Sequence, residues 1–360
     1  MGRVRPTIDD IRSQLCALPK IDLHRHLEGS LRLHTLAEIA QEHDIDLPGR
    51  AIQDLRPLVT VSGEEPDFHR FLEKFKVLRR FYPTREAVER IAYEAVADAA
   101  DDNVQYLELR FNPVALARAQ GFPLEAVTRW VCRGAADARQ DYNIRVNLIV
   151  QIGRDEALET ARELVQVALA HRDEGVVGLD LAGDEEGFPA PPFQAVFRQA
   201  RRDGLHLTVH AGEVGPPANV EEAIRNLEAE RIGHGVRCVE DPRVVQLIRE
   251  RKITLEVCPT SNVQTGAVHD FWRHPLPDLL SLGLRVSINT DDPSISDTTL
   301  TDEYWVAMSA MRITLKQIKR TIVTAAQASF QPREDQERLA AWFRRELELD
   351  DDERRPDNNG

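Results

Sequence analysis

The chain has 360 residues, 42% of them hydrophobic, so it can bury one large core or two ordinary ones. Its 60 acidic and 46 basic side chains leave a formal net charge of −14, which argues against nucleic-acid backbones and anionic membranes as main partners. Its four cysteines are scattered and form no C-x-x-C pair, which excludes a disulfide scaffold and a zinc ribbon and favours reduced thiols in a cytoplasm.

Eight short β-rich runs alternate with segments of helical spacing. The predicted strands are residues 20–24, 104–111, 145–152, 176–183, 206–212, 231–235, 253–259 and 285–292. Several are nearly continuous apolar runs, as expected for parallel strands covered on both faces. Helical patterns such as 123–140, 155–174 and 219–229 fill the gaps. This order predicts an α/β protein with a TIM (β/α)8 barrel, forming one domain over residues 1–349.

The interval from about residue 30 to residue 103 is too long for one βα connection. It contains the helical patterns 30–43 and 67–81, so we expect additional helices inserted after the first strand. These helices can form a lid over the active-site face or pack against the side of the barrel. Phe68, Phe71, Leu72 and Phe75 share one helical face, which core packing explains equally well.

Both ends of the chain are polar. The first 20 residues lack an apolar run of signal-peptide length, and no later stretch is long enough to span a membrane, so we expect a soluble cytoplasmic protein. The charged residues 350–360 predict a disordered tail.

Polar residues cluster where several predicted strands end. In "LPKIDLHRHLEGSLR", His24 and His26 lie two apart and share one face of an extended segment. His210 ends the fifth strand in "HAGE", His234 lies in the sixth in "GHG", and Asp291 and Asp292 follow the eighth in "NTDDP". Such residues at strand C-termini are typical of a barrel active site. The remaining histidines are expected to be structural or exposed: His34, His43, His69, His171, His206, His269 and His274.

Each of these motifs alone has an ordinary structural explanation. H-x-H occurs by chance, "HAGE" fits a buried core histidine, "GHG" fits a close backbone approach, and Asp-Pro starts turns. Their joint occurrence in this order at strand ends favours one shared site.

Three imidazoles and one carboxylate form a natural site for a borderline-soft cation, and zinc is the first choice. The expected ligands are His24, His26, His210 and Asp291, which leave room for a bound water. The fourth strand, in "VVGLDLAGDEEG", offers no lysine to bridge a second metal, so we expect one Zn²⁺ per chain. Zinc lowers the pKa of its bound water to about 7, which predicts metal-assisted hydrolysis.

Six motifs together resemble the adenosine and adenine deaminase family of the amidohydrolase superfamily. They are "PKIDLHRHLEGSLR", "DLAGDE", "HAGE", "RIGHG", "LEVCPTSN" and "SINTDDP", and they span roughly residues 18 to 330 in the order of the family. The resemblance implies a zinc-dependent hydrolase in which zinc-bound hydroxide attacks C6 of a small 6-aminopurine and ammonia leaves.

The resemblance also implies roles for single residues. Glu213 would protonate purine N1, and His234 would orient the zinc-bound water and help to take its proton. Asp292 would hydrogen-bond N7, and the Gly183 amide would donate to N3, where a glycine allows close approach. The residues expected to contact the substrate are His26, Glu28, Gly183 and Asp292.

Glu28 bears on the identity of the substrate. Adenosine deaminases usually carry an aspartate there, beside the ribose 5′-hydroxyl, whereas this chain has "HLEG". "DLAGDE" and Arg32 resemble the nucleoside-type enzymes, so adenosine and 2′-deoxyadenosine are favoured. A 5′-modified adenosine such as aminodeoxyfutalosine is the second possibility, and free adenine is the third.

Three further classes of protein fit the sequence less well. The smaller cytidine-deaminase zinc site needs P-C-x-x-C, and "CPTSN" lacks the cysteine pair. A different metal hydrolase on the same barrel, such as an amidase or phosphoesterase, would show no activity towards adenosine. A catalytically inactive binding protein would have lost a metal ligand or the proton donor, but Glu213 and all four expected ligands are present.

Overall fold

The computed structural model describes residues 7–49 and 51–349, and its strands form one eight-stranded parallel sheet in the order β1 to β8. The strands are β1 (Lys20–His26), β2 (Val104–Phe111), β3 (Arg145–Gly153), β4 (Val176–Ala182), β5 (His206–Ala211), β6 (Arg231–His234), β7 (Thr254–Val257) and β8 (Arg285–Ile288). All eight predicted strands are confirmed. The prediction for the last strand was too long, because β8 ends at Ile288 rather than at residue 292.

The sheet closes on itself between β8 and β1. Arg25 and Asp291 form a parallel bridge, in which the His26 amide donates to the Asp291 carbonyl at 2.8 Å. The Asp291 amide donates to the His24 carbonyl at 2.8 Å. This bridge confirms the predicted barrel, and it brings the residues that follow β8 beside the end of β1.

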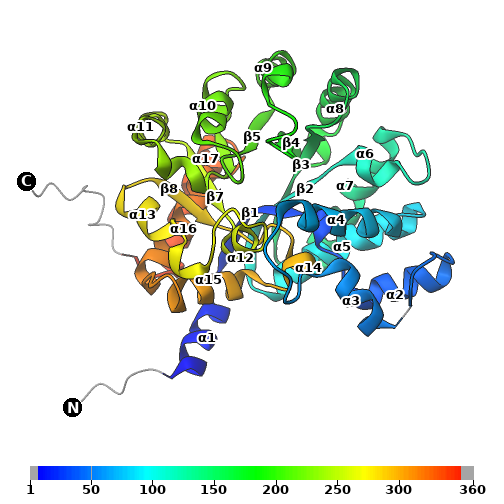
Figure 1. The fold of residues 1–360 in the computed structure, drawn as a ribbon, viewed down its shortest axis with the longest axis horizontal. Helices are drawn as coiled ribbons and strands as arrows, with labels where there is room; N and C mark the ends of the chain where they lie inside the picture. The colour runs from blue at the N-terminus through cyan, green and yellow to red at the C-terminus, as the bar shows by residue number, and fades with distance from the viewer. Residues whose placement is uncertain (1–6, 50, 350–360) are drawn as a thin grey trace, which may run out of the picture.

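Helices surround the strands because each crossover buries an apolar helix face against the sheet. The helices are α1 (Ile8–Ala17), α2 (Leu33–Glu42), α3 (Ile52–Val59), α4 (Phe68–Leu78), α5 (Arg85–Asp101), α6 (Pro113–Ala117), α7 (Leu124–Asp141), α8 (Leu158–Ala170), α9 (Gln194–Arg202), α10 (Pro217–Arg225), α11 (Pro242–Arg251), α12 (Pro259–Gln264), α13 (Leu276–Ser281), α14 (Pro293–Ser296), α15 (Leu300–Ser309), α16 (Leu315–Ala328) and α17 (Arg333–Glu346). Figure 1 shows α8, α9, α10 and α11 as an arc outside the strands.

The helices between β1 and β2 reach the C-terminal end of the barrel. The Val61 amide donates to the Ile295 carbonyl at 2.8 Å, and the Asp67 amide donates to the Gln264 carbonyl at 3.0 Å. These bonds tie the segment before α4 to the connections that follow β7 and β8. Helix α4 therefore lies over the carboxyl ends of the strands, the end at which barrel active sites are built.

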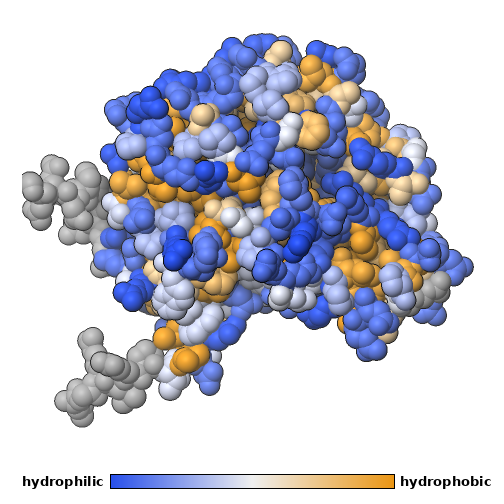
Figure 2. Space-filling view, in the orientation of Figure 1, coloured by the Kyte–Doolittle hydropathy of each residue, from blue (hydrophilic) through white to orange (hydrophobic). Residues whose placement is uncertain are grey.

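The outer surface in the view of Figure 2 is mainly hydrophilic, with apolar residues in separate patches. Within the described residues, no helix is both long and apolar enough to cross a membrane. The predicted tail at 350–360 lies outside the described residues.

Candidate active site

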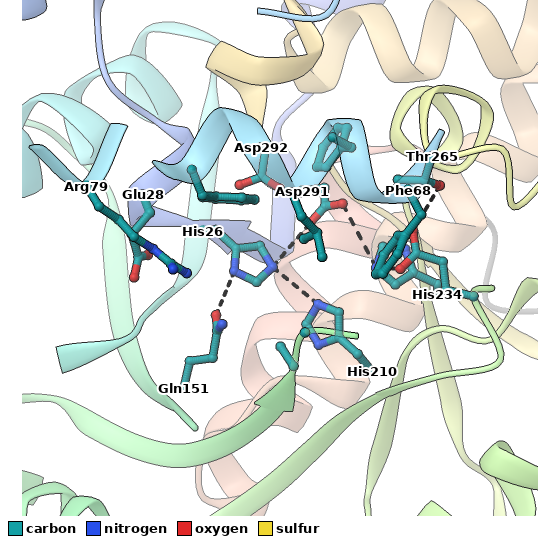
Figure 3. Close-up of a pocket in the computed structure, with 16 residues that line it drawn as sticks. His26, Glu28, Phe68, Arg79, Gln151, His210, His234, Thr265, Asp291 and Asp292 are labelled. Atoms are coloured by element: carbon teal, nitrogen blue, oxygen red, sulfur yellow. Dashed lines mark hydrogen bonds and ion pairs between the residues drawn. The ribbon is translucent and has the colours of Figure 1, made fainter. Parts of the chain in front are cut away.

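A pocket opens at the C-terminal end of the barrel. It is lined by His26, Glu28, Phe68, Phe71, Leu72, Phe75, Arg79, Gln151, Ala182, Gly183, His210, Glu213, His234, Thr265, Asp291 and Asp292. Figure 3 shows helix α4 crossing over this pocket, with the histidines and aspartates on the barrel side. The apolar face of α4 formed by Phe68, Phe71, Leu72 and Phe75 lines the pocket. The sequence alone was equally consistent with packing of this face in the core.

Four polar side chains, carried by β1, β5 and the segment that follows β8, converge at the C-terminal end of the barrel. The Nε2 atoms of His24 and His26 lie 3.3 Å apart, and those of His26 and His210 also lie 3.3 Å apart. Oδ1 of Asp291 lies 3.1 Å from Nε2 of both His24 and His26. One ligand atom from each of the four residues lies within 4.8 Å of the others. Zinc–nitrogen bonds of about 2.0–2.1 Å at tetrahedral angles separate two nitrogens by about 3.3 Å, so this spacing suits such an ion.

The second nitrogen of each imidazole faces a hydrogen-bond acceptor. The acceptors are Glu256 for His24 (2.8 Å), Gln151 for His26 (2.8 Å) and Asp180 for His210 (3.0 Å). Each acceptor holds the ring proton on Nδ1, so each Nε2 presents a lone pair to the shared point. Three lone pairs and a carboxylate that face one another repel unless a cation lies between them. The donor set therefore fits a bound metal ion.

Two of the site residues have a strained backbone. His234 ends β6 with a φ of 61°, and Asp291 has a φ of 63°. Residues other than glycine rarely adopt this left-handed backbone conformation, and those that do are often found at active sites. The bridge to β1 accounts for Asp291, because the Asp291 amide and carbonyl both bond to that strand.

A chain of hydrogen bonds determines which nitrogen of His234 carries the proton. The Leu276 amide donates to Nδ1 of His274 at 3.1 Å, so the proton of neutral His274 is on Nε2, which lies 3.4 Å from Oδ1 of Asn262. The Asn262 amide nitrogen lies 3.0 Å from Nδ1 of His234 and donates to it. Burial lowers the pKa of His274 to about 3 and holds the pKa of His234 well below its ordinary value. Both rings are therefore neutral, and His234 presents an Nε2–H group, 3.5 Å from Oε2 of Glu213.

Two buried carboxyl groups of the pocket have raised pKa values, which favours their protonated forms. Burial, with the charges of Asp291 and Glu185, raises the pKa of Glu213 well above its usual range. Glu213 accepts a 3.1 Å hydrogen bond from the Thr265 hydroxyl. Burial, with the charges of Asp291 and Glu28, likewise raises the pKa of Asp292. Oδ1 of Asp292 has no hydrogen-bond partner among the described residues, so it is available to a ligand.

Glu28 lies at a different end of the pocket. Its Oε1 accepts a 2.8 Å hydrogen bond from the Asn112 amide, and its Oε2 has no partner among the described residues. Burial raises the pKa of Glu28. Arg79 lines the same end, as Figure 3 shows. Gly183 follows β4 with a φ of 108° and also lines the pocket.

His234, Cys258 and Asp291 form a second group with the spacing of metal ligands. This group shares Asp291 with the first. It offers one imidazole, whereas the first group offers three, each with its second nitrogen facing a hydrogen-bond acceptor. We therefore assign the metal position to the first group alone.

The structure brings every sequence-predicted site residue into or directly beside this pocket. The sequence did not reveal the acceptors behind the imidazoles, the Asn262–His274 chain, or Thr265 and Arg79. Glu256 gave a signal, since a charged residue stands in the apolar run "ITLEVCP". His274, expected to be structural or exposed, is buried and acts on His234 through Asn262.

Comparison with known proteins agrees with this architecture. A family model described as adenosine deaminase matches residues 19–343. An adenosine deaminase from Klebsiella pneumoniae is 40% identical over 314 residues, which cover 87% of this chain and 94% of that protein.

Two solved structures superpose over nearly the whole chain. An amidohydrolase from Burkholderia ambifaria with bound Zn has a TM-score of 0.87 at 28% identity, covering 97% of this chain and 95% of that one. An adenine deaminase from Arthrobacter aurescens has a TM-score of 0.85 at 28% identity, covering 92% of this chain and 100% of that one.

Proposed function

The chain belongs to the adenosine deaminase family, and from that premise we propose that it hydrolyses adenosine and 2′-deoxyadenosine at purine C6, releasing ammonia and the 6-oxo nucleoside. The observation that carries the proposal is the convergence of four metal-ligand side chains beside a protonated glutamate in one pocket. The pocket thus combines a place for a metal ion with a proton donor, the two groups that hydrolytic deamination requires.

We assign one zinc ion to His24, His26, His210 and Asp291. The bound zinc in the structure of the B. ambifaria amidohydrolase and the nitrogen-rich donor set both support this choice of metal. When bound, the ion supplies Lewis acidity that lowers the pKa of water to about 7. Glu256, Asp180 and Gln151 orient the three imidazoles through Nδ1.

The protonation states of the pocket match the atoms of an adenine ring. The ring nitrogens N1, N3 and N7 all carry lone pairs and need hydrogen-bond donors. We assign Glu213 to N1, the Gly183 amide to N3 and Asp292 to N7. The raised pKa values of Glu213 and Asp292 support this assignment, because an ionised carboxylate cannot donate. His26, which also lines the pocket, contacts the substrate beside the reacting carbon.

His234 orients the attacking water by donating from Nε2. The sequence-based expectation that this ring also takes a proton from the water requires the proton to be on Nδ1, where Asn262 donates instead. We therefore propose an orienting and charge-stabilising role for His234 and leave proton transfer to Glu213. Over the cycle, water supplies two protons. One leaves on ammonia, and the other restores Glu213 after its own proton has stayed on N1.

The far end of the pocket suits a sugar. The apolar side chains of α4 line the length of the pocket, and at the end near Arg79, Glu28 offers a hydroxyl group a carboxyl oxygen that has no partner among the described residues. Free adenine would leave this oxygen without a partner, which favours a nucleoside. A 5′-modified adenosine such as aminodeoxyfutalosine is the second candidate, because Glu28 extends further than the usual aspartate.

The test is an ammonia-release assay with adenosine, 2′-deoxyadenosine, adenine and 5′-substituted adenosines side by side. We expect the highest kcat/KM with adenosine. Glu28→Asp should shift the preference between adenosine and its 5′-modified analogues, whereas the matched change Glu186→Asp, at an exposed loop position, should not. A protein that releases ammonia only from adenine, or from none of these compounds, would contradict the proposal.

A further inference from the structure

One buried carboxylate in the loop after β4 binds the loop that carries Glu213. Glu185 is 4% exposed, and the described residues donate four hydrogen bonds to it. The donors are the amides of Gly212 (2.9 Å), Glu213 (2.9 Å) and Gly215 (2.6 Å) and the side-chain amide of Asn219 (3.0 Å). All four come from one segment, so the carboxylate holds that segment as a unit.

The glycines of "HAGEVG" allow this close approach. A Cβ atom on Gly215 would lie 2.3 Å from Nδ2 of Asn219 and 2.7 Å from the Glu185 carboxyl carbon. A Cβ atom on Gly212 would lie 2.5 Å from Val220, and Gly212 has a φ of 63°. The segment is therefore built to wrap around the carboxylate, and a larger residue at either glycine would force it away.

The wrapped segment determines where the Glu213 side chain points. Its backbone amide is bonded directly to Glu185, and its carboxyl group extends to the Thr265 hydroxyl and His234. The negative charge of Glu185 also contributes to the raised pKa of Glu213. Glu185 thus acts on Glu213 in two ways, through the backbone and through its charge.

We propose that Glu185 is a positioning residue for the deamination reaction, which holds the acid Glu213 in place to protonate the substrate. The inference rests on the proposed function, because it takes Glu213 as the proton donor. Charge-assisted hydrogen bonds to four donors are stronger than neutral ones, which suits a residue that must prevent small displacements. A displacement of about 1 Å at a catalytic group can cost on the order of 10²-fold in rate.

The test is Glu185→Gln in the metal-loaded enzyme. An amide keeps the shape of the side chain but has only one acceptor oxygen, and its NH2 group faces backbone N–H donors. We expect kcat to fall on the order of 10²-fold. KM and the zinc content per chain should stay within about threefold of the wild-type values, because no ligand of the metal or of the sugar moves. The matched control Glu186→Gln removes the same charge one residue further on, at an exposed position, and should keep wild-type kcat.

A double variant separates positioning from general stability. If Glu185 acts through Glu213, adding Glu185→Gln to Glu213→Gln should leave the residual kcat within about twofold. A full additional loss in that background, or wild-type kcat in the single variant, would overturn the inference. Should Glu185→Gln fail to fold, Asn219→Ala removes one of the four bonds and should show a smaller loss with the same non-additivity. Near-full activity of Glu213→Gln would instead contradict the proposed function itself.

Discussion

The barrel contains two layers of buried charge that differ in how their carboxylates are bonded. In the interior, every carboxylate oxygen of Glu108, Glu256 and Asp180 accepts at least one hydrogen bond, many of them from Arg110 and Arg231. In the pocket above, one oxygen of Glu28 and one of Asp292 have no partner among the described residues. The difference separates carboxylates whose hydrogen bonds are satisfied within the protein from carboxyl groups that have an oxygen available to a ligand.

The direction of the pKa shifts follows the same division. Although burial alone raises the pKa of Glu256, the charges of Arg110 and Arg231 hold it well below its usual range. The pKa of Glu213 is raised, because burial there is joined by negative neighbours instead of arginines. The lowered pKa of Glu256 keeps this interior carboxylate ionised, whereas the raised pKa of Glu213 favours a proton that the pocket can donate.

The largest effect is expected where a pocket charge binds metal. Asp291→Ala should reduce metal affinity by more than the 10–100-fold typical of outer partners of a ligand, and activity should be lost with it. Asp292→Ala should keep the metal and lower kcat/KM by about tenfold or more, through one lost hydrogen bond to the substrate. Metal content per chain, measured by emission spectroscopy beside kcat/KM, distinguishes the two variants. Equal metal loss in both would refute this division of roles.

Glu213→Gln should lower kcat by roughly 10²–10⁴-fold, because an amide cannot supply an acidic proton to the purine. The free energy of unfolding and the metal content should change little, since the amide keeps the size of the side chain and can still accept the hydrogen bond from Thr265. Denaturant unfolding and a rate assay on the same preparation test both statements. A variant with near-full activity would remove Glu213 as the proton donor.

A substitution in the interior layer should lower the stability of the protein, in contrast to Glu213→Gln, which should lower its activity. Arg231 pairs with Glu108 and Glu256 at 2.5 Å, and all three side chains are buried. Arg231→Met leaves two carboxylates without this partner and should lower the free energy of unfolding by about 3–5 kcal/mol. The surface pair of the exposed Arg243 and the half-buried Asp241 supplies the control, since Arg243→Met should cost less than about 1 kcal/mol. An unfolding midpoint unchanged by Arg231→Met would show that the interior layer does not stabilise the barrel.

Glu303 is a buried carboxyl group that belongs to neither layer, and its substitution should have the smallest effect of those considered. Glu303 is fully buried and is held by hydrogen bonds from Thr260 and Thr298 rather than by an arginine. Burial raises its pKa from 4.5 to about 7. Because the folded state holds this proton more tightly, stability falls as pH rises from the unfolded pKa through the folded one.

Glu303→Gln should therefore stabilise the protein at pH 8 by up to about 3 kcal/mol and change it little at pH 4.5. Thermal unfolding of both proteins at the two pH values measures the difference. A variant that is equally stabilised or destabilised at both values would argue against the raised pKa.

The strands could be predicted from the sequence because their apolar runs need no knowledge of neighbours. The end of β8 could not be predicted from the sequence. The residues after Ile288 contact β1 through a single bridge at Asp291, and this contact forms only when the barrel closes. His24, His26, His210 and Asp291 could be grouped because each lies at or near the end of a predicted strand. The acceptors behind the imidazoles could not be predicted. Glu256 and Asp180 lie inside strands and also pair with Arg110, so the sequence does not show that they contact histidines.

The aromatic face of α4 shows a different limit. Phe68, Phe71, Leu72 and Phe75 have the spacing of any buried helix face, and only the position of α4 over the barrel mouth assigns them to the pocket. The hydrogen-bonded chain from His274 through Asn262 is equally invisible in the sequence, since its direction depends on the amide of Leu276.

The central claim is that the polar side chains of the pocket bind one metal ion and an adenine ring. Ammonia release from adenosine, measured on chelator-treated protein during titration with zinc, tests it most directly. We predict no turnover before zinc is added and a return of activity that saturates at one zinc per chain. Full activity of the metal-free protein, or zinc saturation without any ammonia, would contradict the account.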